Sequence, residues 1–125
     1  YKWVIALTSS DALAKTAVGH ICAIEDVPAL LDELLPCVLR GNTMKQLFRT
    51  DDGAVYVLLT NNSGVSRTVA GGEMLLPEAA ETVTLCTKNN KKLTMLEGDS
   101  TIHLSDDGQY HIDIPAGGWF FGTIR

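Results

Sequence analysis

The amino-acid sequence predicts a mainly β protein, an antiparallel β-sandwich of the jelly-roll or immunoglobulin-like kind that is preceded by a short α/β segment. Two observations support this prediction. From Cys37 onward, apolar runs of strand length alternate with clusters of Asn, Asp and Gly, at the spacing expected of a sandwich or barrel. Before Cys37, part of the chain instead follows helical spacing. We therefore expect residues 1–41 to be the end of a preceding domain and residues 42–125 to form the sandwich domain.

The first segment carries the signals of one strand and two helices. The apolar run at residues 2–7 predicts a buried strand, and the polar residues 9–11 suit a helix N-cap. A second helix should begin at Asp26, with Pro28 in its first turn, and should end at Pro36. The apolar residues of this second helix follow the spacing i, i+3, i+4, i+7, i+8 and form one stripe: Val27, Leu30, Leu31, Leu34 and Leu35.

Short apolar runs predict the strands of the sandwich. They lie near residues 37–40, 43–50, 54–60, 65–70, 81–87, 92–97, 100–105, 109–114 and 119–124. The turns between several of them are rich in Asn, Asp and Gly, which tolerate the positive φ that hairpin turns require. These turns are expected at residues 51–53, 61–64, 89–90 and 106–108.

The hairpin around residues 106–108 allows a strand register to be predicted. A two-residue turn would set Ile102 opposite Asp113 and would mix polar and apolar side chains on each face. A three-residue loop, with Gly108 in the left-handed conformation, instead pairs Ile102 with Ile112 and leaves the polar side chains together on the other face. We therefore expect the second register.

The same kind of loop is expected at residues 51–53, where it would pair Phe48 with Tyr56. The strand at residues 55–59 is apolar on both of its faces. This strand is therefore predicted to be central in its sheet.

Three side chains on the polar face of the last hairpin are candidate metal ligands. In the expected register His103 lies opposite His111, and Asp113 lies two residues along on the same face. Cross-strand Cβ atoms about 5 Å apart are compatible with two imidazole ligands of Zn²⁺. Two exposed histidines on the solvent face of a sheet need no metal, however, and this is the interpretation that we favour. His20 and Cys22, two residues apart, are a less convincing pair.

The sequence contains no pattern that predicts catalysis or cofactor binding. It has no G-x-S-x-G elbow, and the glycine pairs at residues 71–72 and 117–118 lack the arrangement of a phosphate-binding loop. The carboxylate pairs at residues 51–52 and 106–107 lie in expected hairpin turns, where they should stay ionised and form the turn. We therefore name no catalytic residue and no cofactor.

Aromatic side chains are the candidates for contact with a carbohydrate or another domain. Trp119 and Phe121 should share one face of the last strand, whereas Phe120 should face the other way, and at least one of these faces must be core. The residues selected for a contact with carbohydrate or with another domain are Trp119, Tyr110 and Phe120.

Composition narrows the class of partner. The chain carries 15 acidic and 10 basic side chains, for a net charge of −5, and the basic residues are scattered along the sequence, which argues against nucleic acid. No apolar run approaches the ~20 residues of a membrane-spanning helix, and the first residues lack a signal-peptide pattern. Three cysteines, Cys22, Cys37 and Cys86, cannot all pair within one chain and are expected to be reduced and buried. Together these features favour a cytoplasmic location.

Two stretches of the sequence resemble a known kind of domain. The run Tyr-Val-Leu-Leu-Thr-Asn-Asn-Ser-Gly at residues 56–64, followed by Arg67, and the run Ile-Pro-Ala-Gly-Gly-Trp-Phe-Phe-Gly at residues 114–122 carry the likeness. They resemble the small β-sandwich domains at the carboxyl end of bacterial multidomain glycoside hydrolases with (β/α)₈ catalytic domains, such as β-galactosidase-like enzymes. The resemblance covers roughly residues 42–125.

The resemblance implies a non-catalytic accessory domain that packs against the catalytic domain of the same polypeptide or against an oligomer partner. The catalytic carboxylates of those families belong to the barrel, and 125 residues are too few for a barrel of about 250, so we expect no activity from this chain alone. Two alternatives remain open: a carbohydrate-binding module that binds glycan itself, and a stand-alone interaction domain.

Overall fold

The computed structural model describes residues 23–125, and the chain divides into two compact units, residues 1–33 and residues 34–125. The predicted strand at residues 2–7, the helix signal at residues 9–11, and the residues His20 and Cys22 lie outside the described residues. A 3₁₀ turn, η1 (Ile24–Asp26), leads into the helix α2 (Val27–Leu34), which carries Pro28 in its first turn and ends shortly before Pro36. The predicted second helix is thus confirmed. In residues 23–125 there is no helix of the length and apolarity that a membrane span requires.

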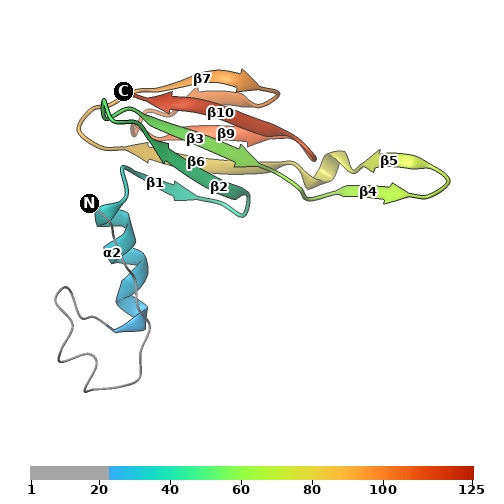
Figure 1. Cartoon of the computed structure of the whole chain (residues 1–125), viewed down its shortest axis with the longest axis horizontal. Helices are drawn as coiled ribbons and strands as arrows, with labels where there is room; N and C mark the ends of the chain where they lie inside the picture. Colours follow the sequence, from blue (N-terminus) through green and yellow to red (C-terminus); the bar gives the residue numbers. More distant parts are fainter. Residues whose placement is uncertain (1–22) are drawn as a thin grey trace. The chain divides into compact units, whose positions relative to one another are not determined.

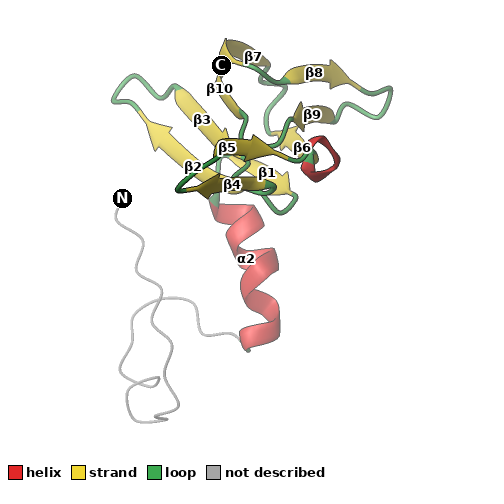
Figure 2. Ribbon diagram, turned by 90° about the vertical axis from the view of Figure 1, so that its right-hand side faces the viewer, coloured by secondary structure: helices red, strands yellow, loops and turns green. Residues whose placement is uncertain are grey.

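The second unit is a sandwich of two four-stranded antiparallel sheets with one additional hairpin (Figures 1 and 2). The first sheet has the order β1 (Cys37–Arg40), β6 (Glu81–Thr87), β9 (Tyr110–Ile114), β8 (Thr101–Leu104). The second sheet has the order β2 (Met44–Arg49), β3 (Val55–Thr60), β10 (Trp119–Ile124), β7 (Leu93–Gly98). The additional hairpin is formed by β4 (Val65–Thr68) and β5 (Gly72–Leu75), and the 3₁₀ turn η2 (Pro77–Ala79) follows it.

Both sheets contribute side chains to one core. The first sheet supplies Val83, Leu85, Ile112 and Ile114, and the second supplies Val55, Val57, Leu59, Phe120 and Ile124. These positions alternate along their strands with positions that are more exposed, as expected where one face of a sheet is covered by a facing sheet. The predicted mainly β sandwich is therefore correct, and the second helix of the predicted α/β segment precedes it in the chain.

The predicted registers are confirmed. Ile102 pairs with Ile112 and Phe48 pairs with Tyr56. Gly53 and Gly108 both have positive φ, at 85° and 81°, because each closes a three-residue hairpin loop. The predicted central strand, β3, lies between β2 and β10.

Two features of the sandwich differ from the predictions. β1 pairs with β6 along its whole length, so the sandwich begins earlier than residue 42, where the boundary was expected. The strand β5 was not predicted, because the glycine pair at residues 71–72 was interpreted as a loop alone. Gly72 has a φ of 72° and begins a strand that returns along β4. The β4–β5 hairpin projects beyond the ends of the other strands (Figure 1).

The two cysteines of the sandwich are free thiols in different surroundings. Cys37 is fully buried in the core, whereas Cys86, on the next strand of the same sheet, is half-buried. Adjacent Cα partners of β1 and β6 are Cys37 with Thr87 and Val38 with Cys86, so the two cysteines occupy alternate faces of the sheet. The expectation of burial therefore holds fully for Cys37 and only partly for Cys86.

Candidate functional site

In the second sheet, the outer face of β2, β3 and β10 carries several large apolar side chains, whereas β7 places Thr94 and Glu97 beside Thr123 and Phe121. On β3, Val55, Val57 and Leu59 point into the core, so Tyr56 and Leu58 point away from it. The same alternation places Phe121 on the outer face. We call the apolar side chains of this surface the outer apolar face: Met44, Phe48, Tyr56, Leu58, Trp119 and Phe121.

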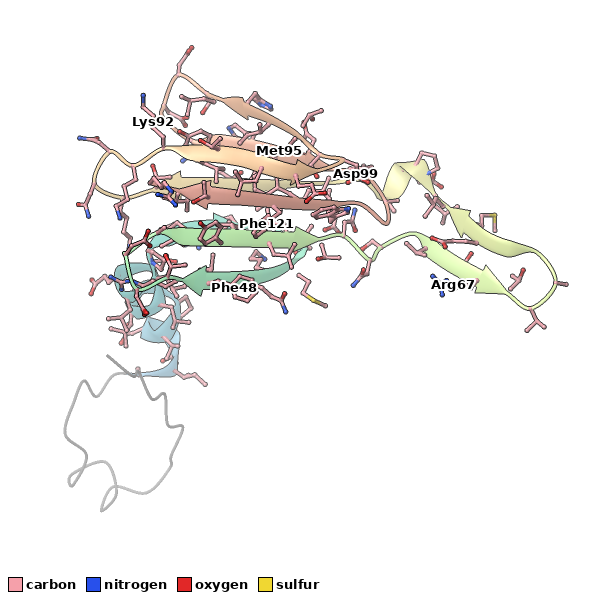
Figure 3. All side chains as sticks on the ribbon, turned by 45° about the horizontal axis from the view of Figure 1, so that its top comes forward. Phe48, Arg67, Lys92, Met95, Asp99 and Phe121 are labelled. Atoms are coloured by element: carbon pink, nitrogen blue, oxygen red, sulfur yellow. The ribbon has the colours of Figure 1, made fainter. Side chains whose placement is uncertain are left out.

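The strand pairing brings these side chains together in rows. Met44, Thr60 and Trp119 form one row across β2, β3 and β10. Leu58 and Phe121 are partners in the second row, and Phe48 and Tyr56 are partners in the third. Figure 3 labels Phe48 on β2 and Phe121 on β10, the two strands that flank β3.

Part of this face is open to solvent. Met44 is 55% exposed, Phe48 is 50% exposed and Trp119 is 37% exposed, although all three are large apolar residues. The outer face of a two-sheet sandwich is normally polar, because it borders water. Exposed apolar side chains gathered on one sheet face make this surface a candidate for contact with another molecule or domain.

The structure separates the three predicted contact residues. Trp119 belongs to the outer apolar face. Phe120 has no exposed surface and lies in the core, so it is removed from the candidate contact residues. Tyr110 packs against the same core, and its hydroxyl oxygen accepts a hydrogen bond from the backbone N–H of Leu93 at 3.3 Å.

Five residues of the outer apolar face were missed by the sequence-based selection: Phe121 on the last strand and four others. Met44, Phe48, Tyr56 and Leu58 lie on β2 and β3 rather than on the last strand. A signal for them was present, because the predicted pairing of Phe48 with Tyr56 and the two-sided apolar pattern of residues 55–59 already required an apolar outer face.

The candidate metal ligands lie on the outer face of the other sheet. The rings of His103 and His111 are stacked, with centroids 5.0 Å apart. Asp113 lies in the next row and accepts a hydrogen bond from the Thr82 hydroxyl at 2.6 Å. Within residues 23–125, no three His, Cys, Asp or Glu side chains are grouped closely enough to hold a metal ion.

The carboxylates of the two Asp-rich loops serve the loops themselves. The Thr50 hydroxyl donates to Asp52, and the backbone N–H of Ala54 donates to the same carboxylate at 3.2 Å. Ser105 and Gln109 make the equivalent bonds to Asp107.

These hydrogen bonds favour the ionised form of both carboxyl groups. They lower the pKa of Asp52 and of Asp107, with the hydroxyl bond from Thr50 or Ser105 as the largest cause in each case. A general acid for glycoside hydrolysis needs a raised pKa instead, so neither carboxylate is suited to that role.

Asn61 joins the two stretches of sequence on which the family resemblance rests. Its side-chain amide donates to the carbonyl oxygens of Ile114 and Pro115, both at 3.2 Å. Its backbone N–H donates to the carbonyl oxygen of Gly118 at 2.9 Å, and its Oδ1 accepts from the Ser63 N–H at 2.9 Å. Asn61 is itself 1% exposed, so this network ties the end of β3 to the loop between β9 and β10.

No protein-family model, no curated protein and no solved structure matches this chain.

Proposed function

We propose that the sandwich is a non-catalytic accessory domain of a bacterial glycoside hydrolase and that it packs, through the outer apolar face, against the catalytic domain of the same polypeptide. The exposed apolar surface formed by Met44, Phe48 and Trp119 carries this proposal. Covering it would remove apolar area from water, which contributes about 25 cal/mol for each Å² buried.

The composition of this face favours a protein partner over a glycan. Its members are aromatic residues, methionine and leucine, and Tyr, Trp, Phe and Met are the residues enriched at the centre of protein interfaces. A glycan needs hydrogen-bonding groups around each stacked ring. On the three rows across β2, β3 and β10, the polar side chains are few: Gln46, Thr60 and Thr123.

The link to glycoside hydrolases rests on the resemblance at residues 56–64 and 114–122. The two stretches meet in space, because the Asn61 side chain donates to the carbonyl oxygens of Ile114 and Pro115. In the two Asp-rich loops, the hydrogen bonds to Asp52 and Asp107 build the turns and lower the pKa of both carboxyl groups, which does not suit a general acid. The chain by itself should therefore hydrolyse no glycoside.

Paired substitutions test the proposal in the full-length protein that the gene encodes. Phe48→Lys places a charge in the outer apolar face, whereas Met74→Lys places the same charge on β5, where Met74 is 56% exposed. Phe48→Lys should lower the melting temperature of the full-length protein by several degrees while changing that of the 125-residue chain much less. Met74→Lys should change neither.

The outcomes separate the proposal from its rivals. Equal small effects of Phe48→Lys in both proteins would show that no domain covers this face. A gene product without a catalytic domain would favour the stand-alone interaction domain.

A further inference from the structure

A polar pocket with a volume of about 390 Å³ opens at one end of the sandwich. The loop between β1 and β2, the end of β3 and the start of β6 form its walls. The polar side chains among its lining residues are those of Asn42, Thr43, Thr60, Asn61, Asn62, Ser63 and Glu81. Met44 supplies an apolar part of the wall.

Two buried oxygen atoms of the lining residues lack a hydrogen-bond partner within residues 23–125. They are Oγ1 of Thr43, a residue that is 5% exposed, and Oε2 of Glu81. The other carboxylate oxygen of Glu81 accepts a hydrogen bond from the Ser63 hydroxyl at 3.1 Å. Buried polar atoms in native proteins are nearly always paired with protein groups or ordered water, so these two atoms mark positions where a water or a bound polar molecule would complete the hydrogen bonds.

The walls of the pocket are held in place by other side chains. The ammonium of Lys45 donates to the carbonyl oxygens of Gly41 at 2.5 Å and of Thr43 at 3.1 Å, which fixes the β1–β2 loop. On the other side of the pocket, the Asn61 side chain accepts a hydrogen bond from the backbone N–H of Ser63 at 2.9 Å. It also donates one to the carbonyl oxygen of Ala79 at 2.9 Å. A pocket whose walls are already ordered loses less entropy when it binds a ligand.

The chemistry of the lining defines the ligand. Hydroxyl and amide groups both donate and accept hydrogen bonds, as alcohol groups do, and a carboxylate accepts from hydroxyl groups. Trp119 is the cross-strand partner of Thr60 and places an aromatic side chain one strand away from the pocket. Glu81 is the one carboxylate among the lining residues, whereas protein sites for Ca²⁺ commonly use several.

We propose that this pocket binds a neutral, hydroxyl-rich small molecule of monosaccharide size. The proposal goes beyond the accessory function, because it concerns a site that the 125-residue chain forms without a partner domain. It also differs from glycan stacking on the outer apolar face, since the hydrogen-bonding groups lie at the end of the sandwich.

The test is a titration of the ¹⁵N-labelled 125-residue chain, followed by NMR, with D-glucose, D-galactose and D-mannose in turn and with CaCl₂ separately. At least one sugar should shift the amide signals of residues 42–44, 60–63 and 81, with a dissociation constant in the millimolar range. Glu81→Gln and Asn42→Ala should each weaken binding about tenfold, the cost of losing one strong hydrogen bond. Glu97→Gln, which removes the same charge from an exposed position on β7, should leave binding unchanged.

Three outcomes would overturn the proposal. One is the absence of localised shifts with every sugar, and another is binding that Glu81→Gln and Asn42→Ala leave intact. The third is a response of these amides to CaCl₂ alone, which would identify a cation site. None of these results bears on the melting experiment with Phe48→Lys, so the two proposals can fail separately.

Discussion

The ring of Tyr56 on β3 stacks on the ring of Phe121 on β10, with centroids 5.8 Å apart and planes 15° apart. Both side chains belong to the outer apolar face, so an aromatic contact lies on the surface of the sheet that faces away from the core. The guanidinium of Arg125 donates to the Tyr56 hydroxyl at 3.4 Å. The stacking and this hydrogen bond hold the two rings in place within the surface that we propose contacts the catalytic domain.

The stacked pair should contribute to stability beyond its buried area. In a double-mutant cycle with Tyr56→Leu and Phe121→Leu, we expect a coupling free energy of about 1 kcal/mol in urea unfolding of the 125-residue chain. Phe121→Leu combined with Leu104→Ala, which lies on the other sheet, should give additive effects. Additive effects of Tyr56→Leu and Phe121→Leu would contradict the stacking.

Asn61→Ala should be strongly destabilising. The substitution leaves the carbonyl oxygens of Ile114, Pro115 and Ala79 without this donor, in and beside a buried region. We expect a loss of about 3 kcal/mol in the free energy of unfolding. Asn62→Ala, at an exposed position next in the chain, should change it by less than about 0.5 kcal/mol. Similar losses for both variants would show that the network contributes little.

The two Asp-rich loops should make stability depend on acid pH. The folded-state pKa of Asp52 and of Asp107 lies below the ordinary value of 3.8. Their contribution is therefore fully present above that value and is lost as the pH falls through the lower folded-state pKa. We therefore expect the free energy of unfolding in urea to fall less steeply at acid pH for Asp52→Asn combined with Asp107→Asn than for the unsubstituted chain.

Asp51→Asn combined with Asp106→Asn is the matched control for this pH experiment, because it removes equal charge from the same loops. In this control the free energy of unfolding should fall at acid pH as steeply as in the unsubstituted chain. If both pairs of substitutions weaken the pH dependence equally, the hydrogen bonds from Thr50 and Ser105 are not its cause.

Cys37 should resist thiol reagents in the folded chain. Burial raises the pKa of its thiol to about 11, so the reactive thiolate is scarce at pH 8. In a titration with a disulfide reagent, Cys37 should react only after unfolding, whereas the half-buried Cys86 should react earlier. Cys22→Ser combined with Cys86→Ser leaves Cys37 as the one thiol of the chain for this measurement. Rapid modification of Cys37 in the folded chain would contradict the core packing.

Local patterns were sufficient to predict most strands and their registers. The pairing of Ile102 with Ile112 follows from loop length and the two-residue period of a strand, and both are properties of a short segment. The missed strand β5 shows the limit of this reasoning, because a glycine pair suits an open loop and a hairpin turn equally well.

The candidate site could be predicted only in part. Alternation shows that Phe120 and Phe121 face opposite ways, but it does not show which face meets the other sheet. That choice depends on the packing of β3 and β10 against strands of the first sheet, which come from distant parts of the sequence. The polar pocket likewise joins loops near residues 42, 62 and 81, which no local pattern connects.

The most direct test of the proposed docking surface is hydroxyl-radical footprinting of the 125-residue chain and of the full-length protein, read by mass spectrometry. Met44 on the outer apolar face and Met74 on β5 are 55% and 56% exposed, so they should be oxidised at similar rates in the 125-residue chain. In the full-length protein we expect oxidation of Met44 to slow several-fold while that of Met74 is unchanged. An unchanged rate at Met44 would contradict the proposal that the catalytic domain covers this face.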